Sequence, residues 1–303
     1  MGPIDVQIAA LAGDRRRGAA EIAGDLAALL VAVAELGRTS PAEAGAVFRR
    51  AVGSVVAGQA SMAPVLNLAN RACSIFEDCG GNWEAIRAQL LAAAEGRTRS
   101  RDALIASAPA LRSRTGKLLV YSYSSTVFDA ILACRDGGWM ERVLCSEGRP
   151  EGEGLTMAGR LAAAGIAVTL YTDAALLSHI RDAACVWVGG DALCGEGLVN
   201  KVGTRALGEL AKLHSIPLFA LLTGDKVLPP ELLGYHKLLP QEAAAFGVAL
   251  GNGIEAVNEY FEFVPLELIT AVLTENGLQS AEGVVAAASA TRVSALFRDI
   301  VSG

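Results

Sequence analysis

From Gly116 onward, short apolar runs alternate with stretches of helical periodicity, and this alternation constrains the fold more than any other feature of the chain. The predicted strands span residues 117–123, 142–146, 167–172, 184–189, 218–223 and 260–264. The predicted helices between them span residues 125–135, 155–164, 174–182 and 204–214. Strands that alternate with helices imply crossover connections and a parallel sheet covered on both faces. The pattern therefore predicts an α/β domain over residues 114–303.

The first part of the chain has only helical periodicity. Apolar residues recur on one helical face at Ile22, Leu26, Leu29, Val33 and Leu36. Ser40 and Pro41 are typical of an N-cap followed by proline at the first helical position. Further helices are predicted at 64–76, 83–94 and 101–111. We therefore expect an all-helical domain over residues 1–113.

Composition excludes several classes of protein. The chain has 303 residues, 52% of them hydrophobic and 19% charged, so it buries a large core and is not disordered. A net charge of −6 without a basic stripe argues against a nucleic-acid partner. The longest apolar helical run, residues 26–34, is too short to cross a membrane.

Cysteine spacing and motif searches predict neither a metal nor a cofactor. The six cysteines form no CxxC pair and no regular framework, so they are interpreted as reduced thiols of a cytoplasmic protein. No HExxH, GxSxG or P-loop pattern occurs. Gly152-Glu153-Gly154 resembles the start of a dinucleotide fingerprint, but no glycine follows three residues later.

Polar residues gather where the predicted parallel strands end, which is where such sheets bind ligands. They are residues 121–126, residues 147–150 with Arg149, residues 189–204 with Asp191, Asn200 and Lys201, and residues 223–226 with Lys226. The third of these segments has the order that an anion site requires. A strand is followed by an acid, a glycine-punctuated loop, an amide, a cation and the start of a helix. Together these groups suit a ligand that carries a phosphate and several hydroxyls.

Each of these residues also has a purely structural interpretation. Residues 124–126 either cap a helix or contact the ligand. Arg149 either binds the ligand or pairs with a nearby glutamate, and Lys201 and Lys226 are either ligand contacts or solvated surface charges. Asp191 follows a buried strand directly, so its carboxylate needs a partner or a catalytic task to offset its desolvation.

The chain resembles the alpha, beta and delta subunits of translation initiation factor 2B and their relatives, methylthioribose-1-phosphate isomerase and ribose-1,5-bisphosphate isomerase. The resemblance covers residues 116 to 277. It is carried by Gly189-Gly190-Asp191, by Asn200-Lys201-Val202-Gly203-Thr204 and by residues 260–269. It implies an N-terminal helical domain, a Rossmann-like C-terminal domain, and a homodimer or higher homo-oligomer.

The resemblance also implies roles for single residues. Asp191 stands where the isomerases have an acid/base aspartate. Asn200, Lys201 and Lys226 match residues that contact the sugar phosphate, and Arg149 lies in a Gly-Arg-Pro similar to the family's Ser-Arg-Pro. Arg17, Gly18 and Ala19 resemble the phosphate-contacting Arg-Gly-Ala of the isomerases, which favours the sugar-phosphate branch of the family.

One residue departs from the isomerase pattern. The isomerases carry a catalytic cysteine just after the first strand of this domain, and Ser122 stands there instead. A hydroxyl is a far poorer acid and nucleophile than a thiol near neutral pH. Cys194 is a candidate substitute thiol.

Three functions therefore remain open. The first is an aldose–ketose phosphate isomerase that uses Asp191 as the acid/base and Ser122 as a hydrogen-bond partner. The second is a non-catalytic protein that senses a sugar phosphate or a nucleotide. The third is a dinucleotide-dependent oxidoreductase, which the incomplete glycine fingerprint argues against.

Overall fold

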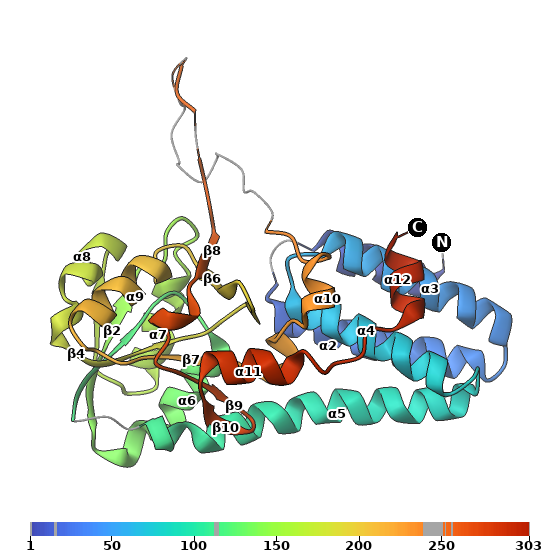
Figure 1. The fold of residues 1–303 in the computed structure, drawn as a ribbon, viewed down its shortest axis with the longest axis horizontal. Coiled ribbons are helices and arrows are strands. Elements are labelled where there is room, and N and C mark those ends of the chain that lie inside the picture. The colour runs from blue at the N-terminus through green and yellow to red at the C-terminus, as the bar shows by residue number, and fades with distance from the viewer. Residues whose placement is uncertain are drawn as a thin grey trace. The chain divides into compact units, whose positions relative to one another are not determined.

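The structure, a computed structural model, describes residues 2–14, 17–111, 115–238, 251, 253–255 and 257–302. The chain divides into two compact units (Figure 1). Unit 1 comprises Met1–Arg99, Asp225–Leu238 and Ala287–Gly303, and unit 2 comprises Ser100–Gly224 and Leu239–Ala286. The sequence-based boundary between residues 113 and 114 marks the change of secondary-structure type, and it stays a prediction of where the domains divide.

Unit 1 is helical. Its helices are α1 (Pro3–Gly13), α2 (Ala19–Gly37), α3 (Pro41–Gly58), α4 (Ala63–Asp78), most of α5 (Trp83–Ser107), α10 (Pro230–Leu233) and α12 (Ala295–Ser302). The C-terminal α12 packs against α3 and α4 and so joins the helices that begin the chain. Pro41 begins α3 as predicted, but the side chain of Ser40 makes no capping hydrogen bond. The two helices predicted at 83–94 and 101–111 are one helix, α5, followed by the 3₁₀ turn Ala108–Leu111.

Unit 2 contains a seven-stranded sheet with the order β10-β9-β7-β4-β1-β2-β3. Its strands are β1 (Gly116–Val120), β2 (Met140–Ser146), β3 (Val168–Tyr171), β4 (Ala183–Val188), β7 (Leu218–Leu221), β9 (Ala271–Thr274) and β10 (Gly277–Gln279). Only the pairing of β9 with β10 is antiparallel. The six parallel strands follow the order 3-2-1-4-5-6 of the Rossmann fold. The predicted α/β class with a Rossmann-like sheet is therefore confirmed.

Helices cover both faces of this sheet (Figure 1). The end of α5, α6 (Ser125–Cys134) and α7 (Glu153–Ala163) share one buried cluster with alternate residues of the central strands, among them Leu118, Val120, Cys185 and Trp187. The opposite face carries α8 (Asp173–Ser178) and α9 (Thr204–Leu213), which contact one another. Because β4 and the last three residues of β1 are buried, these stretches are apolar runs, which is why the two strands are predictable.

A second sheet of three antiparallel strands, β5 (Ala192–Cys194), β6 (Gly197–Lys201) and β8 (Phe261–Val264), corrects two predictions. The segment interpreted as a glycine-punctuated loop is the β5–β6 hairpin, so Asn200 and Lys201 lie on a strand. The strand predicted at 260–264 belongs to this sheet and not to the parallel one. Gly197 permits the close pairing, because a Cβ atom there would lie 2.5 Å from the carbonyl oxygen of Val264.

Candidate functional site

The candidate site lies at the carboxyl ends of β1 and β4, the two strands between which the strand order reverses. Ser122 follows β1, and Gly189 and Asp191 follow β4. The two loops approach closely, since a Cβ atom at Gly189 would lie 2.7 Å from Oγ of Ser124. Open α/β sheets bind ligands at such a reversal. Ser124 itself accepts a hydrogen bond from the backbone N–H of Val127 at 3.3 Å, so its interpretation as a helix cap is confirmed.

Ser122 is held in a strained conformation by two hydrogen bonds. Its φ of 65° is unusual for a residue other than glycine and costs about 1 kcal/mol. Its backbone N–H donates to Oγ of Ser146 at 2.9 Å, and its own hydroxyl donates to Oε1 of Glu153 at 3.0 Å. In this conformation the Ser122 hydroxyl is directed at the Glu153 carboxylate.

Lys201 is buried beneath the site. Only 3% of the residue is exposed, so its interpretation as a solvated surface charge is wrong. Its ammonium lies 2.7 Å from Oε1 of Glu153 and 4.7 Å from the centre of the Tyr260 ring. An ammonium is tolerated at such burial when a carboxylate and an aromatic face replace its water. Ser122 and Lys201, both predicted site residues, thus meet on one oxygen atom.

Glu153 joins these two residues, and the sequence reasoning did not select it. It is the first residue of α7 and follows Gly152, whose φ is 75°. Gly154 allows α7 to begin directly against β2, because a Cβ atom there would lie 1.9 Å from the carbonyl oxygen of Ser146. Oε2 of Glu153 is buried and has no hydrogen-bond partner among the residues that the structure describes. The sequence feature that could have indicated Glu153 as a site residue is its place between two glycines just before a predicted helix.

Asp191 directly precedes the β5–β6 hairpin, and Asn200 lies on β6. The backbone N–H of Asp191 donates to the carbonyl of Val199, the residue before Asn200, at 2.8 Å. Nδ2 of the buried Asn200 donates to Oγ1 of Thr204 at 3.1 Å. The same hydroxyl donates to the carbonyl of Lys201 at 2.6 Å, which fixes the turn into α9.

The start of α9 is occupied by a carboxylate of this chain. Oε1 of Glu262, on β8, accepts hydrogen bonds from the backbone N–H groups of Gly203 at 2.6 Å and Arg205 at 2.9 Å. The sequence predicts that this helix start forms part of an anion site. In the structure, the protein's own Glu262 carboxylate occupies that position. The hydroxyl of Tyr121 donates to the carbonyl of Val202 at 3.1 Å, and burial raises its pKa.

Arg149 lies on the loop after β2. Its backbone N–H donates to Oδ2 of Asp173 at 2.8 Å, and its side chain is exposed. On the same loop, Glu151 accepts a hydrogen bond from the hydroxyl of Tyr260. Burial and then the bond to Glu151 raise the pKa of Tyr260 to about 12, so this hydroxyl stays protonated near neutral pH. A phosphate contact by Arg149 remains a prediction.

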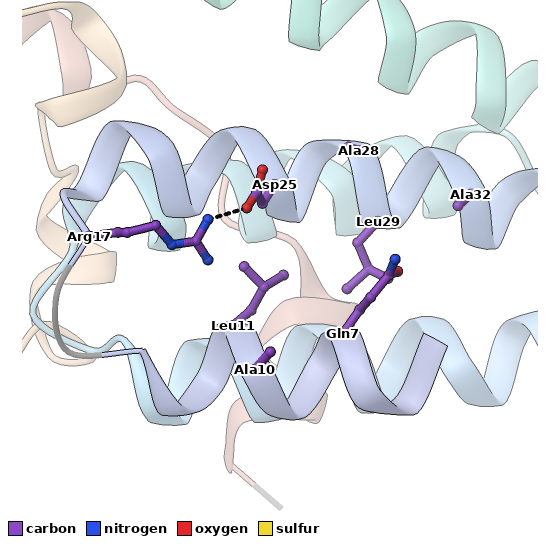
Figure 2. Close-up of a pocket in the computed structure, with 8 residues that line it drawn as sticks. All are labelled: Gln7, Ala10, Leu11, Arg17, Asp25, Ala28, Leu29 and Ala32. Atoms are coloured by element: carbon purple, nitrogen blue, oxygen red, sulfur yellow. Dashed lines mark hydrogen bonds and ion pairs between the residues drawn. The ribbon is translucent and has the colours of Figure 1, made fainter. Parts of the chain in front are cut away.

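The other predicted contacts belong to unit 1. Gly18 precedes α2, Ala19 begins it, and Lys226 ends the 3₁₀ turn Gly224–Lys226. Figure 2 shows Arg17 beside a cavity of about 350 Å³ between α1 and α2. The guanidinium of Arg17 binds two carboxylates, with Nε 2.7 Å from Oδ2 of Asp14 and Nη1 directed at Asp25. In this structure the positive charge of Arg17 is therefore already compensated, and its phosphate contact remains a prediction.

Cys194 has the properties of an unreactive thiol. It is buried on β5, and its Sγ lies 3.5 Å from the carbonyl oxygen of Gly197, to which it donates. Burial raises the pKa of this thiol, which lowers its thiolate fraction near neutral pH. Because the thiolate is the reactive form, these properties argue against Cys194 as a substitute for the family cysteine.

The described part of the chain contains neither a membrane-spanning helix nor a cluster of metal ligands. None of its helices is both long and apolar enough to cross a membrane. Within the same residues, no group of three or more histidine, cysteine, aspartate or glutamate side chains is placed to hold a metal ion.

Residues 15–281 match the family described as the initiation factor 2 subunit family. The chain belongs to this family. Among curated proteins it is 32% identical over 171 residues to ribose 1,5-bisphosphate isomerase of Methanocaldococcus jannaschii, with 55% of each chain covered. It is also 32% identical over 183 residues to methylthioribose-1-phosphate isomerase of Zea mays, with 54% of this chain and 48% of the relative covered. The chain thus spans about half the length of the curated relatives it matches.

Solved structures of this family share the fold. The translation initiation factor eIF-2B of Pyrococcus horikoshii matches with a TM-score of 0.77 and 22% identity, covering 92% of this chain and 98% of its own. The 5-methylthioribose 1-phosphate isomerase of the same organism matches with a TM-score of 0.74 and 18% identity, covering 94% and 87%. Translation factors and isomerases in this family therefore share one fold, so the function of a member must be argued from its site.

Proposed function

We propose that this chain is an isomerase that converts a phosphorylated aldose into the corresponding ketose phosphate. The observation that carries the proposal is that Ser122 and Lys201 share Oε1 of Glu153 at the strand-order reversal, where Asp191 also emerges. A hydroxyl, an ammonium and a carboxylate at one sheet edge suit a ligand with hydroxyls and a phosphate. The curated relatives named as sugar-phosphate isomerases support the same substrate class.

The residues divide into two groups by role. In the proposed reaction, Asp191 moves a proton between neighbouring atoms of the sugar, and the Ser122 hydroxyl hydrogen-bonds the oxygen on which negative charge develops. An aldose and its ketose are isomers, so the reaction consumes no oxidant or reductant. The proposed phosphate and sugar contacts are the earlier predicted set: Arg17, Gly18, Ala19, Arg149, Asn200, Lys201 and Lys226.

The proposal is tested by incubating the chain with ribose 1,5-bisphosphate, methylthioribose 1-phosphate and a panel of aldose phosphates, and measuring ketose phosphate. We expect one substrate to be converted, and Asp191→Asn to lower kcat by about 100-fold or more. Asp136→Asn is the matched control, because Asp136 is 87% exposed and remote from the site, and it should leave kcat unchanged. Tight binding of one panel member without turnover of any would reject the proposal.

A second candidate function is a non-catalytic sensor of a sugar phosphate or nucleotide. It is favoured by the serine hydroxyl at position 122, where the isomerases have a thiol. A ligand that binds only the folded chain raises its melting temperature. A sensor is therefore expected to show this stabilisation without turnover, and any turnover that Asp191→Asn abolishes would exclude it.

We also propose that the chain acts in the cytoplasm as a homodimer or larger homo-oligomer. The support is the resemblance of the chain to a family whose members form oligomers, and a structural neighbour from C. thermophilum is described as the tetrameric eIF2B-beta2-delta2 complex, which holds two copies of each of two related subunits. Light scattering coupled to size-exclusion chromatography tests this directly, and a monomeric mass at all concentrations would contradict it.

A further inference from the structure

The positive charge of Lys201 is already compensated in the structure described above. Its ammonium lies 2.7 Å from Oε1 of Glu153, and only 4% of its side chain is exposed. The surrounding elements add further negative charge. Burial and then the charges of four carboxylates, in decreasing order Asp173, Glu262, Glu153 and Glu147, raise the pKa of Tyr121. An anion that binds Lys201 therefore meets the Glu153 carboxylate already there, with three further carboxylates acting on the neighbouring Tyr121.

Such an anion would share one ammonium with Glu153. Two negative groups within a few ångströms of one another repel strongly in a partly buried site. Oε2 of Glu153 has no hydrogen-bond partner among the described residues, so no hydrogen bond stabilises negative charge on that oxygen. The other groups that face Oε1 and Lys201 are the neutral hydroxyl of Ser122 and the ring of Tyr260. A proton on Glu153 removes the repulsion without moving Lys201.

We propose that Glu153 takes up one proton when an anion binds at Lys201. The inference rests on the proposed function only in assigning Lys201 to the anion. In the complex, Glu153 is a neutral carboxylic acid that lies 3.0 Å from the Ser122 hydroxyl. The site then holds a transferable proton next to the residue that replaces the family's cysteine, so Glu153 supplies the acid that serine lacks.

The test is isothermal titration calorimetry with inorganic sulfate, which remains a dianion near neutral pH and so adds no proton exchange of its own. Titrations in two buffers of different ionisation enthalpy measure the protons taken up. We expect the wild-type chain to take up about one proton for each sulfate that it binds. Above neutral pH, the Kd for sulfate is then expected to rise by up to about tenfold for each pH unit. Lys201→Met is expected to abolish sulfate binding.

Two variants assign the proton. Glu153→Gln is expected to take up none and to bind sulfate at least about tenfold more tightly at alkaline pH, because the competing charge is gone. Glu151→Gln is the matched control, since Glu151 lies on the same loop but binds the hydroxyl of Tyr260 and not Lys201, and it should keep the uptake. Circular dichroism checks that each variant is folded.

Several results would overturn the inference. The wild-type chain could fail to bind sulfate, or could bind it without taking up a proton. Proton uptake could be unchanged in Glu153→Gln or lost in Glu151→Gln. Sulfate binding could also survive the Lys201→Met substitution. The wild-type pH dependence decides the matter even if a variant fails to fold. The readout needs no turnover, so a chain that takes up a proton through Glu153 but isomerises no sugar phosphate supports the inference and rejects only the proposed function.

Discussion

Ser122 and Lys201 bind the same atom, Oε1 of Glu153, at 3.0 Å and 2.7 Å. One residue comes from the loop after the first parallel strand and the other from the hairpin after the fourth. The carboxylate that joins them begins the helix after the second strand. A single oxygen atom thus connects three segments of the α/β unit. The charge next to Lys201 and the direction of the Ser122 hydroxyl both depend on it.

Ser122→Cys is expected to raise kcat of the proposed isomerisation by roughly 10- to 100-fold. A thiol is a far stronger acid than a hydroxyl, and cysteine fits the volume of serine. The strain at φ 65° is unchanged, because both residues carry a Cβ atom. The measurement is kcat for the preferred substrate of the panel. Ser122→Ala is the control, and a Ser122→Cys variant no faster than it would contradict the account.

Lys201→Met is expected to lower the free energy of unfolding by about 1–3 kcal/mol, because it leaves the Glu153 carboxylate without its ammonium. The 27% exposure of the Glu153 side chain keeps the loss below that of a fully buried pair. The double variant Lys201→Met, Glu153→Gln is expected to recover most of this stability. Urea unfolding of the two single variants and the double variant measures the coupling, and strictly additive effects would show that the pair does not interact.

Gly203→Ala is expected to cost about 2–4 kcal/mol of unfolding free energy. Its φ of 100° disfavours any side chain, and a Cβ atom would lie 2.1 Å from the hydroxyl oxygen of Tyr121. Gly195→Ala is the matched control, because Gly195 has no atom within 4 Å of the added Cβ and no positive φ. The control should change stability by less than about 0.5 kcal/mol in the same urea titration. Equal effects of the two substitutions would contradict the close approach described here.

Alkylation by iodoacetamide near neutral pH is expected to modify Cys79 first and to leave activity unchanged. Cys79 is half-buried, whereas the other five cysteines are buried. Burial raises the pKa of Cys145 and of Cys185 to about 12, so their reactive thiolates form only as the pH approaches that value. Peptide mass spectrometry measures the order of labelling. Rapid labelling of Cys194 together with loss of activity would instead make it the substitute thiol.

The parallel sheet could be predicted because its central strands are buried on both faces. β4 and the last three residues of β1 are apolar runs, and the helices between strands have their own periodicity. The short strands β5 and β6 could not be predicted in this way. Gly195 and Gly197 lie within three residues of one another and read as a loop, and only the pairing of β5 with β6, and of β6 with β8, shows that the segment forms a hairpin.

The same distinction applies to the site. The places of Ser122 and Asp191 were predictable, because parallel strands deliver the residues that follow them to one edge of the sheet. Glu153 was not, because its role depends on contacts with residues far away in the sequence. Neither the burial of Lys201 nor the occupation of the α9 start by Glu262 leaves a local pattern, since each depends on how β6 pairs with β8.

A crystal structure of the chain soaked with ribose 1,5-bisphosphate tests the central claim, that Lys201 is the anion contact of a sugar-phosphate site, most directly. The account predicts a phosphate oxygen within hydrogen-bond distance, about 3 Å, of Nζ of Lys201, with the sugar directed toward Ser122 and Asp191. A fully bound ligand that leaves Lys201 paired only with Glu153 and lies away from Asp191 would contradict it.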